Sequence, residues 1–254
     1  MRLFHVKRLL PSLLLLLAAC GSAIGSGQAD QSVSATPLAQ PRHWAVFLVA
    51  GDDSAPVFDH AVARFQTLLD RPSVSSIHSF TSDPNKAAPA DLATIDHLAA
   101  AMTAPALAAD TGCLVFVTSH GDRSGAYLKL DLDHDQRLSP ARLGDLLDAT
   151  CGQRPTVAII SACHSGVFLD DEAANRIILT AARADRTSFG CGASFDYTYF
   201  DSCLLDQWPR SHSFVGLYDA VGLCVREKER QLGLVSSEPQ ASFGPAVRNL
   251  ALPN

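Results

Sequence analysis

Two short apolar runs, each followed by a reactive side chain and a glycine, constrain the fold of this chain more than any other feature. The first is CLVFVTSHG at residues 113–121, and the second is TVAIISACHSG at residues 156–166. Short runs rich in β-branched residues that end at a glycine are typical of strands buried on both faces of a sheet. Parallel strands of this kind bring their carboxyl ends to one edge, where catalytic groups collect in open α/β sheets. We therefore expect His120 and Cys163 to meet there, as a base beside a nucleophilic thiol.

The segments around these runs alternate between strand and helix patterns. Apolar strand-like runs occur at 43–50 and 74–80, and apolar residues recur at helical spacing at 59–70 and 91–102. Further predicted elements are a β-extension at 126–132, a helix at 140–150, a strand at 176–182, a long amphipathic helix at 214–232 and a short edge strand at 237–244. Alternation of this kind predicts an α/β fold, with a mostly parallel sheet and helices on both faces.

Length and charge limit the domain organisation and the partners. The 254 residues are 47% hydrophobic and 18% charged, which is enough apolar material for one sizeable core. We expect a single folded domain at residues 42–254. The net charge of −6 is spread without long runs. The sequence therefore predicts no nucleic acid partner and no electrostatic attraction to an anionic membrane surface.

The N-terminal residues have the pattern of a targeting segment. Three basic residues among the first eight precede an apolar stretch at 9–19 that is too short to span a bilayer. The stretch leads into LAACG at residues 17–21, which resembles the bacterial lipobox, whose cysteine is lipidated before cleavage. This resemblance predicts a signal peptide at 1–19 and a lipid anchor on Cys20. The alternative is an ordinary secretory signal that happens to contain a cysteine.

The residues after the proposed anchor predict where the protein is retained. Gly21 stands where an Asp commonly retains lipoproteins at the inner membrane, so we expect an outer-membrane anchor with the domain in the periplasm. Residues 20–41 are rich in Ser, Gly, Ala, Gln and Pro and lack an apolar period. They predict a flexible tether between the membrane and the domain.

Export to an oxidising compartment changes how the seven cysteines are interpreted. Cys113 opens the first apolar run and Cys151 lies just before the second. If the two strands are neighbours, these thiols share the edge opposite the reactive residues, and we favour a Cys113–Cys151 disulfide. The alternative, two reduced cysteines buried as small hydrophobic residues, is nearly as well supported, because a sequence does not fix disulfide connectivity.

An acidic segment, DLDHDQRLS at residues 131–139, resembles the start of an EF-hand calcium loop. Gln136 replaces the glycine of that loop, and Arg142 stands where a bidentate Glu is needed. We therefore favour a solvated acidic turn over a calcium site at Asp131–Asp135. No metal or cofactor is expected elsewhere, because the chain contains no G-x-S-x-G, Walker, dinucleotide-binding or H-E-x-x-H motif.

The residues that end the two runs have the chemistry of a Cys-His peptidase. Such an enzyme needs a thiolate, an imidazole that stabilises it and protonates the leaving amine, and donors for the oxyanion. Cys163 and His120 supply the first two, and the backbone N–H groups of Gly121 and Cys163 are candidate oxyanion donors. His164 competes as the base, but adjacent side chains on a strand point to opposite faces. The alternative is an inert buried thiol beside a hydrogen-bonded loop histidine.

At these motifs the sequence resembles the legumain-type cysteine peptidases of the caspase-haemoglobinase group, which includes asparaginyl endopeptidases and the catalytic subunit of the GPI transamidase. SHG at 119–121 matches the family's His-Gly, and SACHSG at 161–166 matches Glu-Ala-Cys-Glu-Ser-Gly. TAA at 180–182, followed by TSFGC at 187–191, matches Thr-Ala-Ala followed by Ser-Ser-Tyr-Ala-Cys. TYF at 198–200 resembles a further family segment. The resemblance covers residues 43–244 and implies a three-layer caspase-haemoglobinase-like fold.

The resemblance also implies roles for individual residues. His120 and Cys163 would form the catalytic dyad, and Thr187 and Ser188 would lie at the S1 pocket. Two more substrate-binding candidates are Ser165, inside the cysteine motif, and Asp53, in the loop after the first predicted strand.

Two departures from the family bear on specificity. Legumains carry an Asn and an Arg after the first strand, which support the His and bind the P1 side chain, and GDDSAP at 51–56 has no clear counterpart of them. His164 replaces the Glu beside the nucleophile. The resemblance therefore supports Cys-His acyl transfer more firmly than cleavage after Asn.

The sequence thus predicts a cysteine-type endopeptidase that hydrolyses peptide or protein substrates through an acyl-enzyme. Two alternatives remain at this point. One is a transamidase or peptide ligase that uses the same dyad, and the other is a catalytically silent binding lipoprotein.

Overall fold

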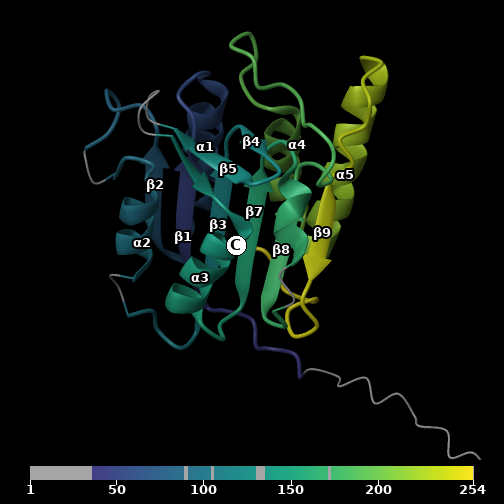
Figure 1. Cartoon of the computed structure of the whole chain (residues 1–254). Coiled ribbons are helices and arrows are strands. Elements are labelled where there is room, and N and C mark those ends of the chain that lie inside the picture. The colour runs from purple at the N-terminus through teal and green to yellow at the C-terminus, as the bar shows by residue number, and fades with distance from the viewer. Residues whose placement is uncertain (1–35, 89–90, 104–105, 130–134, 171–172, 254) are drawn as a thin grey trace, which may run out of the picture. The chain divides into compact units, whose positions relative to one another are not determined.

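A mostly parallel sheet forms the centre of the domain. The computed structural model describes residues 36–88, 91–103, 106–129, 135–170 and 173–253. Within them, six strands form the main sheet in the order β2-β1-β3-β7-β8-β9 (Figure 1). The bounds are β1 (His43–Ala50), β2 (Val74–Thr81), β3 (Thr111–Thr118), β7 (Thr156–Ser161), β8 (Arg176–Thr180) and β9 (Gln240–Phe243). Neighbouring strands are parallel except β8 and β9.

Helices cover both faces of this sheet and produce three layers (Figure 1). Helices α1 (Val57–Leu69), α4 (Tyr199–Gln207) and α5 (Phe214–Gln231) pack on one face. On the other face lie α2 (Ile95–Thr103), α3 (Pro140–Cys151) and the 3-10 helix η2 (Ser165–Asp170). The predicted α/β fold with helices on both faces is therefore confirmed.

Two apolar cores, one on each face of the sheet, explain why the segments that form β3 and β7 are apolar throughout. Alternate residues of β3 and β7 enter opposite cores: Phe116 and Ile159 join the core under α1, α4 and α5, and Val115 and Ile160 join the core under α2 and α3. Successive strand side chains point to opposite faces. A strand covered on both faces therefore needs apolar residues at every position rather than at every second one.

A small antiparallel sheet follows His120 directly. It contains β4 (Gly121–Asp122), β5 (Gly125–Lys129) and β6 (Asp135–Leu138). The φ of Gly125 is 142°, and a Cβ atom at this position would clash with the carbonyl oxygen of Leu138. The Tyr127 N–H group donates to the His120 carbonyl oxygen at 2.9 Å, and the Ser119 hydroxyl donates to the Tyr127 carbonyl oxygen at 2.8 Å. This sheet therefore fixes the backbone on both sides of the candidate base.

Side-chain hydroxyl groups determine where three of the helices begin. Ser139, Thr198 and Ser213 are the N-cap residues of α3, α4 and α5, and each hydroxyl accepts a backbone N–H from the first turn. Pro140 occupies the first turn of α3, where its missing N–H group costs no hydrogen bond.

The predicted elements and the observed ones agree closely in the sheet. The predicted strands 43–50 and 74–80 correspond to β1 and β2, and the predicted helices 140–150 and 214–232 correspond to α3 and α5. Helix α4 was not predicted. It is only nine residues long and mixes apolar and polar residues, so its apolar face becomes evident only where Phe200, Cys203 and Leu204 enter the core.

Two disulfides lie on opposite faces of the sheet, one in each core. Cys113 at the start of β3 is bonded to Cys151 at the end of α3, with their Cα atoms 6.1 Å apart. Cys203 of α4 is bonded to Cys224 of α5, a pair for which the sequence offered no specific prediction. Cys163 and Cys191 are the free cysteines of the described part of the chain.

Residues before position 42, where the domain was predicted to begin, already form hydrogen bonds with it. The Leu38 N–H group donates to the Ala246 carbonyl oxygen at 2.8 Å, and the Gln40 side chain bonds with the backbone of Asn249 and Ala251. Leu38 and Gln40, which fall in the segment predicted to be a tether, therefore contact the C-terminal segment of the domain.

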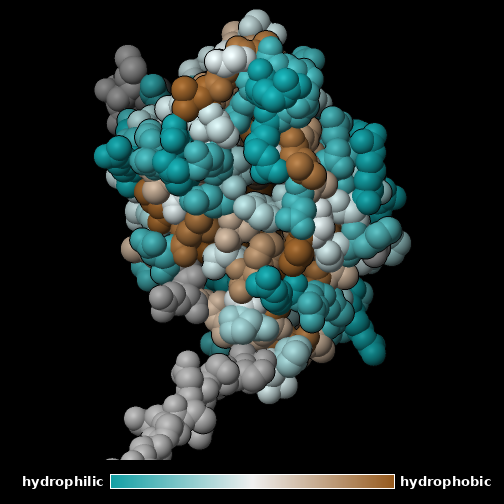
Figure 2. Space-filling model, turned by 90° about the vertical axis from the view of Figure 1, so that its right-hand side faces the viewer, coloured by the Kyte–Doolittle hydropathy of each residue, from teal (hydrophilic) through white to brown (hydrophobic). Residues whose placement is uncertain are grey.

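Several other predictions concern residues outside the described part. The predicted signal peptide at 1–19, Cys20, and residues 131–134 of the acidic segment lie there. Asp135, which is described, forms an ion pair with Arg137. Among the described helices, none is long and apolar enough to cross a membrane. The face beside α5 and β9 is mostly hydrophilic, with apolar residues in small separate groups (Figure 2).

Candidate active site

His120 lies just beyond the carboxyl end of β3. Its half-buried ring packs edge-on against Phe58 of α1, with the ring centroids 5.2 Å apart. A hydrogen bond with the Cys191 thiol is the main cause that raises the pKa of His120, and the charge of Asp52 acts in the same direction. Burial and the charge of Lys129 oppose this without cancelling it. The imidazole therefore holds its proton to a higher pH than an ordinary histidine, as a proton donor to a leaving amine requires.

Cys163 follows the carboxyl end of β7 by two residues and is half-buried. The Ser188 N–H group donates to Cys163 Sγ at 3.3 Å, and the thiol faces the Ser188 carbonyl oxygen at 3.7 Å. The sulfur therefore lies against the loop that follows β8, which forms the opposite wall of the site.

The two strand ends place His120, Gly121 and Cys163 at the same edge of the sheet. Strands β3 and β7 are neighbours, and the Ser119 N–H group donates to the Ser161 carbonyl oxygen at 3.0 Å. A Cβ atom on Gly121 would lie 2.9 Å from the Cys163 carbonyl oxygen. Only glycine permits this approach, so the loops that carry the imidazole and the thiol are in direct contact.

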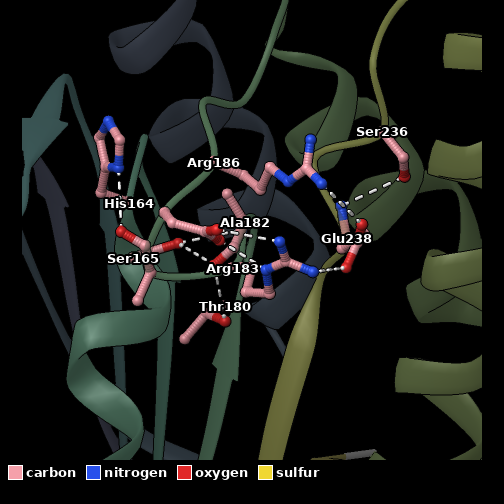
Figure 3. Close-up of polar contacts among 10 residues, drawn as sticks. His164, Ser165, Thr180, Ala182, Arg183, Arg186, Ser236 and Glu238 are labelled. Carbon is pink, nitrogen blue, oxygen red and sulfur yellow. Dashed lines mark hydrogen bonds and ion pairs between the residues drawn. The ribbon is translucent and has the colours of Figure 1, made fainter.

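His164 turns the chain sharply after Cys163. Its φ of 58° lies in the left-handed region, which non-glycine residues adopt rarely and mostly at special sites. The His164 N–H group donates to the Arg186 carbonyl oxygen at 2.8 Å, and Nδ1 lies 3.0 Å from the Ala184 carbonyl oxygen (Figure 3). Because a carbonyl oxygen only accepts, Nδ1 carries the proton. His164 therefore anchors the loop after β8, which leaves His120 as the candidate base.

Ser165 is buried close to the candidate nucleophile in the chain. Its side chain is 1% exposed, and its Oγ accepts the Ala182 N–H group at 3.1 Å (Figure 3). The hydroxyl therefore ties η2 to the end of β8, and substrate binding by Ser165 stays a prediction.

Thr187 and Ser188 lie on the loop whose backbone holds the thiol. Thr187 is exposed and Ser188 is half-buried. The backbone contacts of Ser188 with Cys163 Sγ bring this pair beside the candidate nucleophile, and the resemblance to legumains predicts the S1 pocket at these two residues.

A cluster of charged side chains fixes the start of that loop (Figure 3). Arg183 pairs with Glu238 at 2.6 Å and with Asp185, and Arg186 lies 3.5 Å from the other Glu238 oxygen. These side chains are partly exposed, so each pair contributes little free energy. Their combined geometry joins the loop after β8 to the segment before β9.

Cys191 is a site residue that the sequence reasoning did not single out. It is a free, half-buried thiol, and its interaction with the His120 imidazole is the main cause of the raised pKa of that ring. Its signal is its place at the end of TSFGC, the segment in which the resemblance implies a role only for Thr187 and Ser188.

The loop after β1 contributes Asp52 rather than Asp53. Asp52 is 4% exposed, its Oδ1 accepts the Ser54 N–H group at 2.8 Å, and its charge raises the pKa of His120. Asp53, the residue predicted to bind substrate, is exposed. Two adjacent acids could not be told apart by sequence, because their burial depends on how the loop turns.

The described residues contain no group of three or more His, Cys, Asp or Glu side chains placed to hold a metal ion.

Comparisons with known proteins bear on this constellation. The model of the peptidase C13 family, the legumain family, matches residues 108–217, a span that includes His120, Cys163 and the loop after β8. Over these residues the chain is similar to the peptidase C13 family. A sequence search of curated proteins found no match.

A solved structure extends the similarity from this segment to most of the domain. The crystal structure of caspase-1 from Spodoptera frugiperda superposes with a TM-score of 0.58 at 13% identity, covering 85% of this chain and 92% of that one. At this identity the likeness concerns the fold alone, which is the caspase-haemoglobinase-like fold. The resemblance recognised in the sequence is confirmed, and family and fold together indicate a protein of the cysteine peptidase type.

Proposed function

We propose that this protein is a cysteine endopeptidase that hydrolyses peptide bonds through Cys163 and His120. The observation that carries the proposal is the contact between the two loops at the carboxyl ends of β3 and β7, with a free thiol on one and an imidazole of raised pKa on the other. The C13 relationship supports peptide or protein substrates.

In the proposed reaction, the Cys163 thiolate attacks the carbonyl carbon of the scissile bond and forms a C–S bond. The electron pair of the carbonyl moves to its oxygen, where the backbone N–H groups of Gly121 and Cys163 stabilise the charge. Collapse of this intermediate breaks the C–N bond, and the imidazolium of His120 protonates the departing amine. His120 then takes a proton from water, and the hydroxide attacks the thioester carbon. The C–S bond breaks, which releases the carboxylic acid and restores the thiolate and the imidazolium.

We further propose that Thr187 and Ser188 form one wall of the S1 pocket. The Ser188 backbone contacts Cys163 Sγ. When the carbonyl carbon of a substrate residue lies within reach of the sulfur, the side chain of that residue therefore lies beside this loop. The exposed Thr187 hydroxyl is free to face that side chain.

The proposed location is the periplasmic side of the outer membrane, with a lipid on Cys20. The lipobox-like segment at 17–21 supports the anchor. The disulfides Cys113–Cys151 and Cys203–Cys224 support an oxidising compartment, because structural disulfides are rare in the cytosol. Metabolic labelling with a fatty acid tests the anchor: wild-type protein takes up label, and uptake by Cys20→Ala would remove Cys20 from the proposal.

A peptide library and a cysteine-directed activity probe test the reaction. We expect the probe to label wild-type protein at Cys163 and the Cys163→Ala variant not to be labelled there. Cys191→Ala is the matched control, because it removes the other free thiol of the described residues and leaves the proposed nucleophile in place. Equal labelling and turnover in wild type and Cys163→Ala would refute the proposal. A competing amine in the same assay separates hydrolysis from transfer, since amide products would identify a transamidase.

A further inference from the structure

Asp201 is a buried carboxyl group that the proposed reaction does not use. It lies in the first turn of α4 and is 0% exposed. Burial raises its pKa to about 6, and hydroxyl groups of Thr118, Ser161 and Thr198 act in the opposite direction. These partners are uncharged, and within the described residues Oδ1 has no hydrogen-bond partner. A buried carboxylate with an unpaired oxygen is unfavourable, so packing alone does not account for an acid here.

Helix capping does not account for the carboxyl group either. The Asp201 N–H group donates to Thr198 Oγ1 at 3.0 Å, which is the N-cap bond of α4. An acid at this third helical position commonly turns back to the backbone N–H of the N-cap residue. Instead, Asp201 Oδ2 accepts the hydroxyl of Thr118 at 2.6 Å. The carboxyl group therefore faces the sheet rather than the end of its own helix.

The two strands that it faces are those that carry the thiol and the imidazole. Thr118 and Ser161 are the last residues of β3 and β7 and are register partners. Each lies two residues before a member of the proposed dyad. Ser161 Oγ lies 3.4 Å from Thr198 Oγ1. The first turn of α4 thus contacts both strand ends at the point where the chain leaves the sheet for the site.

We propose that Asp201 is a positioning residue for Cys163 and His120. Its carboxyl group holds the end of β3 through Thr118, while Thr198 of the same turn contacts the end of β7, so that the imidazole stays within reach of the thiol. The inference rests on the proposed function, since it assigns Asp201 a role in that reaction. A misplacement of about 1 Å can reduce a rate about a hundredfold, so loss of this contact lowers kcat more than it changes KM.

Matched substitutions on both sides of the hydrogen bond test the role. Asp201→Asn keeps the size of the side chain and removes its charge, Thr118→Val removes the hydroxyl, and Thr118→Ser retains it. Asp206→Asn is the control, because it removes an exposed carboxylate from the same helix. The measurements are kcat and KM for a peptide substrate and the rate at which iodoacetamide alkylates Cys163, resolved by peptide mass mapping.

We expect Asp201→Asn and Thr118→Val to lower kcat about tenfold or more, with KM changed by less than about twofold. The alkylation rate of Cys163 near neutral pH falls in parallel. Thr118→Ser rescues both quantities, and Asp206→Asn behaves as wild type. If Asp201→Asn does not fold, the Val and Ser variants of Thr118 carry the test.

Contrary results separate the inference from the proposed function. Unchanged kcat and alkylation in the Asp201 and Thr118 variants, with Cys163→Ala inactive, would overturn the positioning role alone. Lower thermal stability with unchanged kcat per folded molecule would also overturn it. If wild-type protein shows no turnover and Cys163 reacts no faster than free cysteine, the proposed function fails and the inference fails with it.

Discussion

Replacing Asp201 with Asn changes the pH dependence of stability in a direction that the structure specifies. Burial raises the pKa of this carboxyl group from 3.8 to about 6. One pKa unit corresponds to about 1.4 kcal/mol, so the shift corresponds to about 3 kcal/mol. The folded state holds the proton more tightly than the unfolded state. The contribution of Asp201 to stability is therefore greatest below about pH 4 and is lost as the pH rises through about 6.

An Asn side chain does not titrate, so the variant escapes this loss. We expect the free energy of unfolding of Asp201→Asn, minus that of wild type, to increase by about 2 kcal/mol between pH 4 and pH 7, because the unfolded carboxyl group is already mostly ionised at pH 4. All other titrating groups are common to both proteins and cancel in the difference. Urea unfolding, monitored by the fluorescence of Trp44 and Trp208, measures this difference. The two side chains are 3% and 4% exposed. Reductant is omitted so that both disulfides stay closed.

A difference that is flat across this pH range would refute the reasoning, because it would mean that Asp201 titrates alike in the folded and unfolded states. The Asp206→Asn control separates the effect of burial from that of losing a negative charge on α4. A decrease in this difference from pH 4 to pH 7 would show that the folded state stabilises the carboxylate, in contradiction to its burial without a charged partner.

The free cysteines and the disulfides support three more predictions. Cys163→Ala abolishes peptide hydrolysis, whereas Cys191→Ala retains it near neutral pH, as measured by turnover of one substrate. The Cys191 contact is the main cause that raises the pKa of His120, so Cys191→Ala lowers this pKa. An NMR titration of the ring measures the pKa. In the same variant, the alkaline limb of the pH–rate profile moves to lower pH. Replacing both cysteines of Cys113–Cys151 with Ser lowers the free energy of unfolding by about 4 kcal/mol, and doing so for Cys203–Cys224 lowers it by about 3 kcal/mol, because the disulfides close loops of 38 and 21 residues.

Each of these predictions has a result that contradicts it. Hydrolysis by purified Cys163→Ala above the level of a mock preparation would exclude Cys163 as the nucleophile. A His120 pKa that is unchanged in Cys191→Ala would mean that the imidazole does not bond with that thiol in solution. Equal urea midpoints for the disulfide variants and wild type, with mass spectrometry confirming closed disulfides in the wild type, would contradict the loop-closure estimate.

The sheet was predictable because its sequence signal is local. The β3 and β7 runs are apolar at every position, and the neighbouring segments alternate with helical patterns. Burial on both faces requires such runs, and the ends of parallel strands meet at one edge by geometry. The meeting of the loops that carry His120 and Cys163 therefore needed no knowledge of the packing of individual side chains.

The finer parts of the site were not predictable for the opposite reason. Ser165 and Asp53 were expected to contact substrate, but burial of Ser165 against Ala182 and exposure of Asp53 depend on the turns of two loops. The contact of Cys191 with His120 joins positions far apart in the chain. No local pattern reports such a contact, because it arises from the way the loop after β8 folds back over β3 and β7.

The amino-acid sequence alone determined the α/β architecture and the arrangement that brings His120 and Cys163 to one edge of the sheet, because each follows from a short pattern of burial and chain direction. The tertiary structure decided which side chains surround that pair. It placed Cys191 and Asp52 near His120, turned His164 away to Ala184, and set Asp201 beneath the ends of both strands. Such contacts join distant segments, and their geometry exists only once two cores and two disulfides have brought those segments together.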